Sequence, residues 1–272
     1  MPLTNIQRKV LKLLAERRTP ESYVGGATVL HRDNASPRFS RDIDFFHDVE
    51  KSIALSAETD FATLQENDIK VEWILQNPTF YRAEASISDE RIKLEWAVDS
   101  AFRFFPVIRD PVCGYRLHEI DAAVNKILAM AGRREARDFV DILHIHKTSL
   151  SLGALAWAAC GKDPGYTPPF LLNQANRNAC YTQAQLDQIS LSKKLDIKDL
   201  KRNWLKALEE SRELVNRLPA SEIGCLYLSS DGKPVTPDPD SSEFDNLKRH
   251  FGSLRGAWPT VEHLPDDYAG HR

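Results

Sequence analysis

The sequence predicts an α+β fold in which an N-terminal lobe with a mixed β-sheet precedes a mainly helical C-terminal lobe. Segments that alternate between polar and apolar residues, or that are rich in β-branched and aromatic residues, gather before residue 100. From His118 onward, apolar residues instead recur every three or four positions, as they do on one helix face. We expect a sheet-containing lobe over 1–117, a helical lobe over 118–220 and a C-terminal extension over 221–272.

The N-terminal lobe opens with a helix expected over 5–17, where apolar residues recur at helical spacing after Thr4 as the N-cap. A short apolar segment then leads to the pair Gly25-Gly26, which opens a second helix. The remaining expected elements are a strand over 42–46, a helix over 57–66, and strands over 69–75, 80–87 and 91–98.

The C-terminal lobe is expected to consist of helices. Helical spacing of apolar residues is found over 120–128, 139–145, 152–159 and 197–218. A proline-rich stretch, 164–169, interrupts this series. The last fifty residues contain a Ser-Ser-Asp-Gly turn and scattered prolines, and they predict a loosely packed tail.

Composition excludes several classes of protein. The net charge of −3 excludes a uniformly basic surface, but it leaves room for a local basic cleft that binds phosphates. None of the four cysteines forms a C-x-x-C pair, which argues against a zinc knuckle or a disulfide framework. No stretch approaches the ~18–20 apolar residues of a membrane span. We therefore expect a soluble cytoplasmic protein with no membrane partner.

The strongest chemical signal is the segment Asp42-Ile43-Asp44 in a predicted strand. Side chains alternate along a strand, so both carboxylates lie on one face, where like charges repel. A divalent cation relieves that repulsion, because Mg²⁺ takes hard oxygen ligands and joins protein carboxylates to nucleotide phosphates. A D-x-D pattern is also common on solvated strand faces, so the neighbouring motifs have to decide between these interpretations.

The pair Gly25-Gly26 is the first of these motifs. Glycines leave the backbone bare at the start of a helix, where amide groups can approach a phosphate. Taken alone, the pair equally indicates a tight turn. The chain contains no P-loop, G-x-G-x-x-G or G-x-S-x-G motif, which argues against a Walker-type NTPase, a dinucleotide enzyme or a serine hydrolase.

A third acid is expected from the predicted strand 91–98, in which apolar residues alternate with Lys93 and Glu95. Glu95 could stand beside Asp42 and Asp44 and complete a site of three carboxylates. The alternative is a surface ion pair between Lys93 and Glu95 on an edge strand.

Two blocks of sequence together resemble the AbiEii/AbiGii-type nucleotidyltransferase toxins, which are DNA polymerase β-like nucleotidyltransferases. The first block joins 25–30 (GGATVL) to 38–46 (RFSRDIDFF), and the second joins 126–129 (KILA) to 137–142 (RDFVDI). The family typically has a Gly-Gly-Thr-Ala-Leu-like run where this chain has Gly-Gly-Ala-Thr. The resemblance covers roughly 23–145, and the chain beyond Pro164 adds nothing to it.

The resemblance implies transfer of a nucleoside monophosphate from an NTP to an acceptor hydroxyl, with release of pyrophosphate. The expected catalytic and metal-binding residues are Asp42, Asp44 and Glu95, with Mg²⁺ or Mn²⁺ as the cofactor and Glu95 as a metal ligand or a base. The expected nucleotide-binding residues are Gly25, Gly26, Ser40, Lys126 and Asp138. The resemblance also implies a toxin or phage-defence role, a separately encoded antitoxin, and RNA as the acceptor, notably the 3′ end of tRNA.

Two other functions remain open at this point. A small-molecule nucleotidyltransferase of the antibiotic-modifying kind would use the same motifs with a different acceptor cleft. A catalytically silent binding module could keep the fold, although clustered acids cost stability unless they bind something. An RNA acceptor would need a basic surface, expected at Arg133, Arg134 and Arg137 and at 193–202, unless these are ordinary solvated charges.

Overall fold

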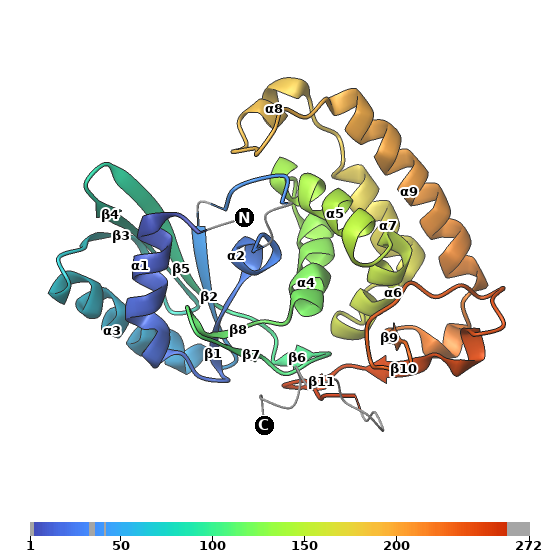
Figure 1. Ribbon diagram of the computed structural model, residues 1–272, viewed down its shortest axis with the longest axis horizontal. Coiled ribbons are helices and arrows are strands. Elements are labelled where there is room, and N and C mark those ends of the chain that lie inside the picture. Colours follow the sequence, from blue (N-terminus) through green and yellow to red (C-terminus); the bar gives the residue numbers. More distant parts are fainter. Residues whose placement is uncertain (1–2, 33–35, 41, 260–272) are drawn as a thin grey trace. The chain divides into compact units, whose positions relative to one another are not determined.

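The computed structural model describes residues 3–32, 36–40 and 42–259, and the chain divides into two compact units. The first unit comprises Met1–Ala101 and Pro106–Ala122, and the second comprises Phe102–Phe105 and Ala123–Arg272. A seven-stranded mixed sheet forms the centre of the first unit, whereas the second is mainly helical (Figure 1). The predicted α+β class is confirmed.

The sheet of the first unit has the strand order β3-β4-β5-β2-β1-β8-β7. Its strands are β1 (Ser22–Gly25), β2 (Asp42–His47), β3 (Lys70–Asn77), β4 (Phe80–Ile87), β5 (Glu90–Val98), β7 (Ile108–Asp110) and β8 (Gly114–Arg116). β2 pairs with β5, and β1 with β8, in parallel, and the other neighbours are antiparallel. The central position of β2 places the D-x-D segment in the middle of the sheet.

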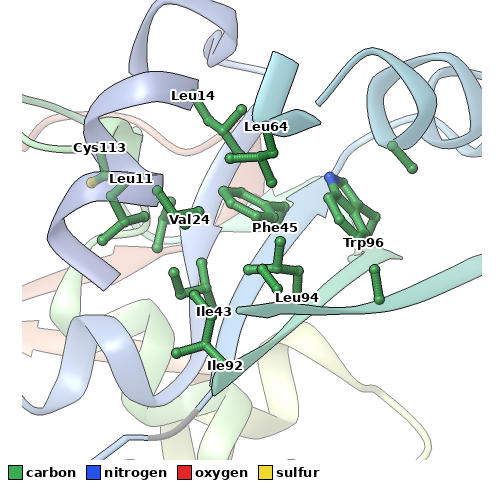
Figure 2. Close-up of a cluster of buried hydrophobic side chains, with 14 of the residues drawn as sticks. Leu11, Leu14, Val24, Ile43, Phe45, Leu64, Ile92, Leu94, Trp96 and Cys113 are labelled. Carbon is green, nitrogen blue, oxygen red and sulfur yellow. The ribbon is translucent and has the colours of Figure 1, made fainter. Parts of the chain in front are cut away.

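The two faces of the sheet differ because side chains alternate along each strand. On β2, Ile43 and Phe45 are fully buried, while Asp42 and Asp44 are only half-buried. The apolar face packs against α1 (Asn5–Leu14) and α3 (Ile53–Glu66). Figure 2 shows this core, in which Ile43, Phe45, Leu94 and Trp96 lie with Leu11, Leu14 and Leu64. The opposite face therefore carries the acidic side chains.

Helix α1 begins at the residue that the sequence predicts. Thr4 is its N-cap: the Thr4 side chain accepts a hydrogen bond from the Gln7 amide, and the Gln7 side chain accepts one from the Thr4 amide. The α-helix ends at Leu14, and a 3₁₀ turn over Ala15–Arg17 continues it to the expected end. This turn leads the chain to the buried Arg18.

Arg18 forms a buried ion pair beneath the strands that carry the acids. Its Nη2 lies 2.7 and 2.6 Å from the two carboxylate oxygens of Asp60, and Trp96 Nε1 donates to the same carboxylate at 2.8 Å. The Arg18 guanidinium also lies 4.7 Å from the centre of the Phe45 ring. Because Phe45 follows Asp44 and Trp96 follows Glu95, these contacts fix both strands from their buried side.

The second unit contains most of the helices. Its helices are α4 (Glu119–Gly132), which begins in the first unit, α5 (Ala136–Thr148), α6 (Leu152–Lys162), α7 (Pro168–Arg177), α8 (Gln183–Asp187) and α9 (Ile197–Arg217). The proline-rich stretch is a break only up to Thr167, because Pro168 occupies the first turn of α7, where its missing N–H has no partner to lose. In the described part of the chain, no helix is long and apolar enough to cross a membrane.

The C-terminal segment is more ordered than its composition indicates. Every residue of β9 (Cys225–Leu228) is buried, and β9 pairs antiparallel with β10 (Lys248–Phe251). A second small sheet joins β11 (Ser253–Leu254) to β6 (Phe102–Arg103). The expectation of a loosely packed tail is wrong for these strands. The buried run Cys-Leu-Tyr-Leu does not alternate, so the period-two pattern could not reveal it.

Candidate active site

The structure brings Asp42, Asp44 and Glu95 to one face of the sheet. β2 and β5 are parallel neighbours, and the Cα of Asp44 is directly opposite that of Glu95. The buried residues of both strands point the other way, toward α1 and α3. Adjacent strands lie about 4.8 Å apart, so Glu95 is the neighbour of Asp44 in the sheet, and a ligand shared by the three acids stays a prediction.

The pair Gly25-Gly26 lies beside Asp44 and leaves room for its carboxylate. β1 pairs antiparallel with β2, so Gly25 lies opposite Asp44. Gly26 begins α2 (Gly26–Leu30) with φ +61°, and an added Cβ there would overlap Asp44 Oδ2 and lie 2.8 Å from the carboxylate carbon. At Gly25, a Cβ would lie 2.5 Å from the Phe46 ring. Gly26 therefore accommodates Asp44 and Gly25 accommodates the Phe46 ring, and contact of either glycine with phosphates stays a prediction.

Two hydroxyl groups hold the backbone of Asp42. Thr28 Oγ1 and Ser40 Oγ each donate a hydrogen bond to the Asp42 carbonyl oxygen at 3.0 Å. Gln7 Nε2 in turn donates to the Ser40 carbonyl at 2.9 Å. The Ser40 hydroxyl thus supports the strand that carries Asp42 and Asp44 in this structure. Sequence reasoning missed this role of Thr28, although the residue lies inside the glycine block that was singled out.

Glu95 has a partner that the sequence did not indicate. Arg82 of β4 lies directly across from it, and Arg82 Nε and Nη2 both lie 2.8 Å from Glu95 Oε1. The ion-pair partner of Glu95 is therefore Arg82, not Lys93. Alternation along β4 could have placed Arg82 on the same face as Glu95. The residue directly opposite Glu95, however, depends on the length of the β4–β5 turn.

The donor set fits a hard divalent cation. Asp42, Asp44 and Glu95 supply carboxylate oxygens only, which suits Mg²⁺ or Mn²⁺ and not a soft metal. The backbone beside Asp44 is bare at Gly26, where a Cβ would fill the space. Among residues 3–32, 36–40 and 42–259, no three Asp, Glu, His or Cys side chains already converge as a cation site.

The other predicted site residues belong to the second unit. Lys126 is buried, and its Nζ lies 2.8 Å from Asp138 Oδ1 and 3.2 Å from Asp141 Oδ2. Burial alone would raise the pKa of Asp138, but Lys126 and Arg133 together hold that pKa below its ordinary value. Asp138 and Asp141 do share one helix face, as their spacing predicts. Contact of Lys126 or Asp138 with a nucleotide stays a prediction.

Two arginines expected on a basic surface are engaged within the second unit. Arg133 Nε donates to Asp138 Oδ2 at 2.8 Å. Arg134 donates to the Cys180 carbonyl and lies over the Tyr181 ring, 5.7 Å from its centre. Both side chains are nevertheless exposed, so binding of RNA by Arg133 and Arg134 stays a prediction.

A mixed sheet with two aspartates on one strand, a Gly-Gly turn beside them and a third acid on the parallel neighbour defines a nucleotidyltransferase. The family model "Nucleotidyl transferase AbiEii toxin, Type IV TA system" matches residues 13–220. The chain belongs to this family of toxins, as the two sequence blocks predict.

Two solved structures are similar to this chain, and the likeness to the first supports the fold. MenT4, the nucleotidyltransferase toxin Rv2826c from Mycobacterium tuberculosis H37Rv, is 15% identical, with a TM-score of 0.54 over 79% of this chain and 83% of that chain. JHP933 from Helicobacter pylori is 18% identical, with a TM-score of 0.47 over 78% of this chain and 91% of that chain. No curated protein matches this sequence. At 15% identity the likeness to MenT4 shows the fold alone.

Proposed function

We propose that this nucleotidyltransferase depends on a divalent metal and transfers a nucleoside monophosphate from an NTP to an RNA 3′ end, with tRNA as the first candidate. The observation that carries the proposal is the register of the parallel strands, which sets Glu95 beside Asp44 on the face that also holds Asp42. In this proposal the modified RNA is the target through which the toxin acts.

The metal would be held by Asp42, Asp44 and Glu95. When bound, Mg²⁺ or Mn²⁺ supplies positive charge to the triphosphate and makes the acceptor hydroxyl easier to deprotonate. Thr28 and Ser40 keep the strand in place by binding the Asp42 carbonyl, so that both carboxylates are presented on the same face. Gly26 excludes any side chain that would displace Asp44.

The remaining nucleotide contacts belong to the same proposal. Gly25 and Gly26 offer backbone without a side chain to the phosphates, and Ser40 lies two residues before the first acid. Lys126, held by Asp138, carries the charge that would stabilise the departing pyrophosphate.

The segment 193–206, which includes the start of α9, supports an RNA acceptor. Residues 193–206 contain six basic and two acidic residues, a net charge of +4 in a chain whose net charge is −3. The lysine side chains of 193, 194, 198 and 201 are exposed and, within the described residues, form no ion pair. Exposed lysines without an acidic partner are a usual means of binding a phosphate backbone. The family's toxin–antitoxin system also implies an antitoxin, and we propose that both act in the cytoplasm.

The test compares Asp44→Asn with Asp89→Asn, an exposed residue of the β4–β5 turn. Each variant is incubated with Mg²⁺, each labelled NTP, and total RNA or an aminoglycoside. We expect Asp44→Asn to reduce labelling of RNA by about 100-fold or more, because several kcal/mol of charge stabilisation are lost. Asp89→Asn should label RNA as the unmodified protein does.

The unfolding temperature without metal supplies the control for folding. Removing one of two repelling carboxylates should leave this temperature unchanged or raise it. A sharp decrease would show that Asp44 is structural and would contradict the proposed site. Label that enters only the aminoglycoside would favour the small-molecule transferase, and no incorporation at all would favour a silent binding module.

A further inference from the structure

We propose that Arg82 is a positioning residue that fixes Glu95 in the orientation in which Glu95 binds the metal. This inference rests on the proposed function, because it takes Glu95 to be a metal ligand. Arg82 lies outside every motif of the sequence and acts only through its contact with Glu95.

The first observation is the row of residues across three strands. Asp44 of β2 is opposite Glu95 of β5, and Glu95 is opposite Arg82 of β4. Residues directly opposite each other on neighbouring strands share a face. Arg82 is therefore two strands, about 10 Å, from Asp44, on the side of Glu95 that faces away from the aspartates.

The second observation is how the guanidinium holds the carboxylate. Both Arg82 nitrogens bind the same oxygen, Oε1, at 2.8 Å. Within the described part of the chain, no hydrogen bond involves Glu95 Oε2. One oxygen thus anchors the side chain, and in this proposal the other oxygen binds the cation.

The third observation is that Arg82 is itself held. Its guanidinium lies 5.0 Å from the centre of the Phe80 ring, two residues earlier on β4. A planar guanidinium with fixed donors orients a carboxylate better than an ammonium group does. Even so, an ion pair at 36% and 23% side-chain exposure contributes little to stability. A positioning role can therefore be measured without unfolding the protein.

The chain provides a matched control in Arg91. Arg91 of β5 binds Glu84 of β4, with Nη1 3.0 Å from Oε1, so this is also an Arg–Glu pair between the same two strands. Neither residue is in the row of Asp44. Loss of Arg91 removes the same charge and the same kind of contact at a place where positioning of Glu95 is unaffected.

Two roles of Arg82 predict opposite changes in metal affinity. If Arg82 positions Glu95, its removal weakens metal binding, since residues that orient a ligand commonly account for about 10- to 100-fold in affinity. If Arg82 only neutralises Glu95, its removal frees a carboxylate and takes away a repelling cation. Metal binding would then become tighter.

The experiment measures Mn²⁺ binding to the full chain without NTP, using the electron paramagnetic resonance signal of free Mn²⁺. We expect Arg82→Met to weaken binding by about 10-fold or more, and Arg91→Met to leave it unchanged. Arg82→Lys keeps the charge and should recover part of the affinity. Unchanged or tighter binding in Arg82→Met, or equal weakening in Arg91→Met, would overturn the proposal.

A double-mutant cycle separates this proposal from the function on which it rests. With Glu95→Gln in place, adding Arg82→Met should weaken Mn²⁺ binding no further, because Arg82 acts through Glu95. If Asp44→Asn leaves Mn²⁺ affinity intact, the proposed metal site itself fails. If Asp44→Asn abolishes binding while Glu95→Gln or Arg82→Met has no effect, only the present inference fails.

Discussion

Gly26 shows how closely the backbone approaches the candidate site. With φ +61°, a residue that has a Cβ would be strained, at a cost of about 1–2 kcal/mol. The same Cβ would overlap the carboxylate of Asp44. We expect Gly26→Ala to displace Asp44 and to reduce nucleotide transfer by more than the loss of stability explains. Thermal unfolding and transfer to RNA, measured on the same preparation, check this.

Gly132 at the end of α4 is the control for this substitution. A Cβ added there meets no atom within 4 Å. Gly132→Ala should therefore be neutral or stabilise the helix by up to about 1 kcal/mol, with transfer unchanged. Equal activity of the two alanine variants would show that the bare backbone at Gly26 does not matter.

At the scale of elements, α9 combines two functions. One side, with Leu200, Trp204 and Leu208, is buried, while the opposite side carries exposed lysines and Leu205, which is 62% exposed. Of the basic residues in its first half, Arg202 lies 3.2 Å from Asp199 and Lys206 lies 3.7 Å from Glu210. The charges available to a partner are therefore the uncommitted lysines.

Reversing two of these charges tests whether α9 binds RNA. We expect Lys198→Glu with Lys201→Glu to weaken tRNA binding and to lower the slope of log affinity against log salt by roughly 1.5. Affinity for free NTP should not change. Fluorescence anisotropy of labelled tRNA over a series of NaCl concentrations gives both quantities.

The control carries the same change of charge elsewhere. Lys9 and Lys12 are exposed on α1, so Lys9→Glu with Lys12→Glu alters net charge equally. RNA binding that falls alike in both double variants would show a general effect of charge and would contradict a docking surface on α9.

The elements differ in how far the sequence could predict them. The strand over 80–87 is found at its predicted bounds, and α9 differs from its predicted range by one residue, because alternation and helical spacing are local signals. The sequence did not predict α7, because its first residues are prolines. It did not predict β9, because all four of its residues are buried and show no alternation. Spacing alone predicted that Asp42 and Asp44 share one strand face, as they do. It could not predict the contact of Arg82 with Glu95, because strand pairing sets that contact.

The stability of the whole molecule should respond to pH through His47. This side chain is fully buried at the end of β2, and its Nε2 lies 3.0 Å from Ser22 Oγ. Burial, and then the charge of Arg18, lower the pKa of His47 from 6.5 to about 4. Between these values the unfolded chain binds a proton that the folded chain does not. The free energy of unfolding therefore decreases as pH falls from 6.5 to 4.

The size of this effect is up to about 3 kcal/mol, since each pKa unit corresponds to 1.36 kcal/mol. We expect the difference in unfolding free energy between pH 7 and pH 4 to be smaller in His47→Gln than in the unmodified protein. Urea unfolding at several pH values measures it. Asp110, whose pKa is lowered to about 2, contributes only below this window. Parallel pH curves for the two proteins would contradict the prediction.

The parallel pairing of β2 with β5 has a consequence for how this site can vary between relatives. After Asp44 the chain passes through α3 and the β3–β4 hairpin before it returns as β5. Insertions in those connections lengthen the segment between β2 and β5 without moving Glu95. A shift of one residue in the pairing of β5 with β2 would instead turn Glu95 toward the apolar core. The sequence distance between the second and third acids is therefore free to drift. In a distant homologue, the third acid is better identified as the residue paired with the second aspartate than by its distance from that aspartate in the sequence.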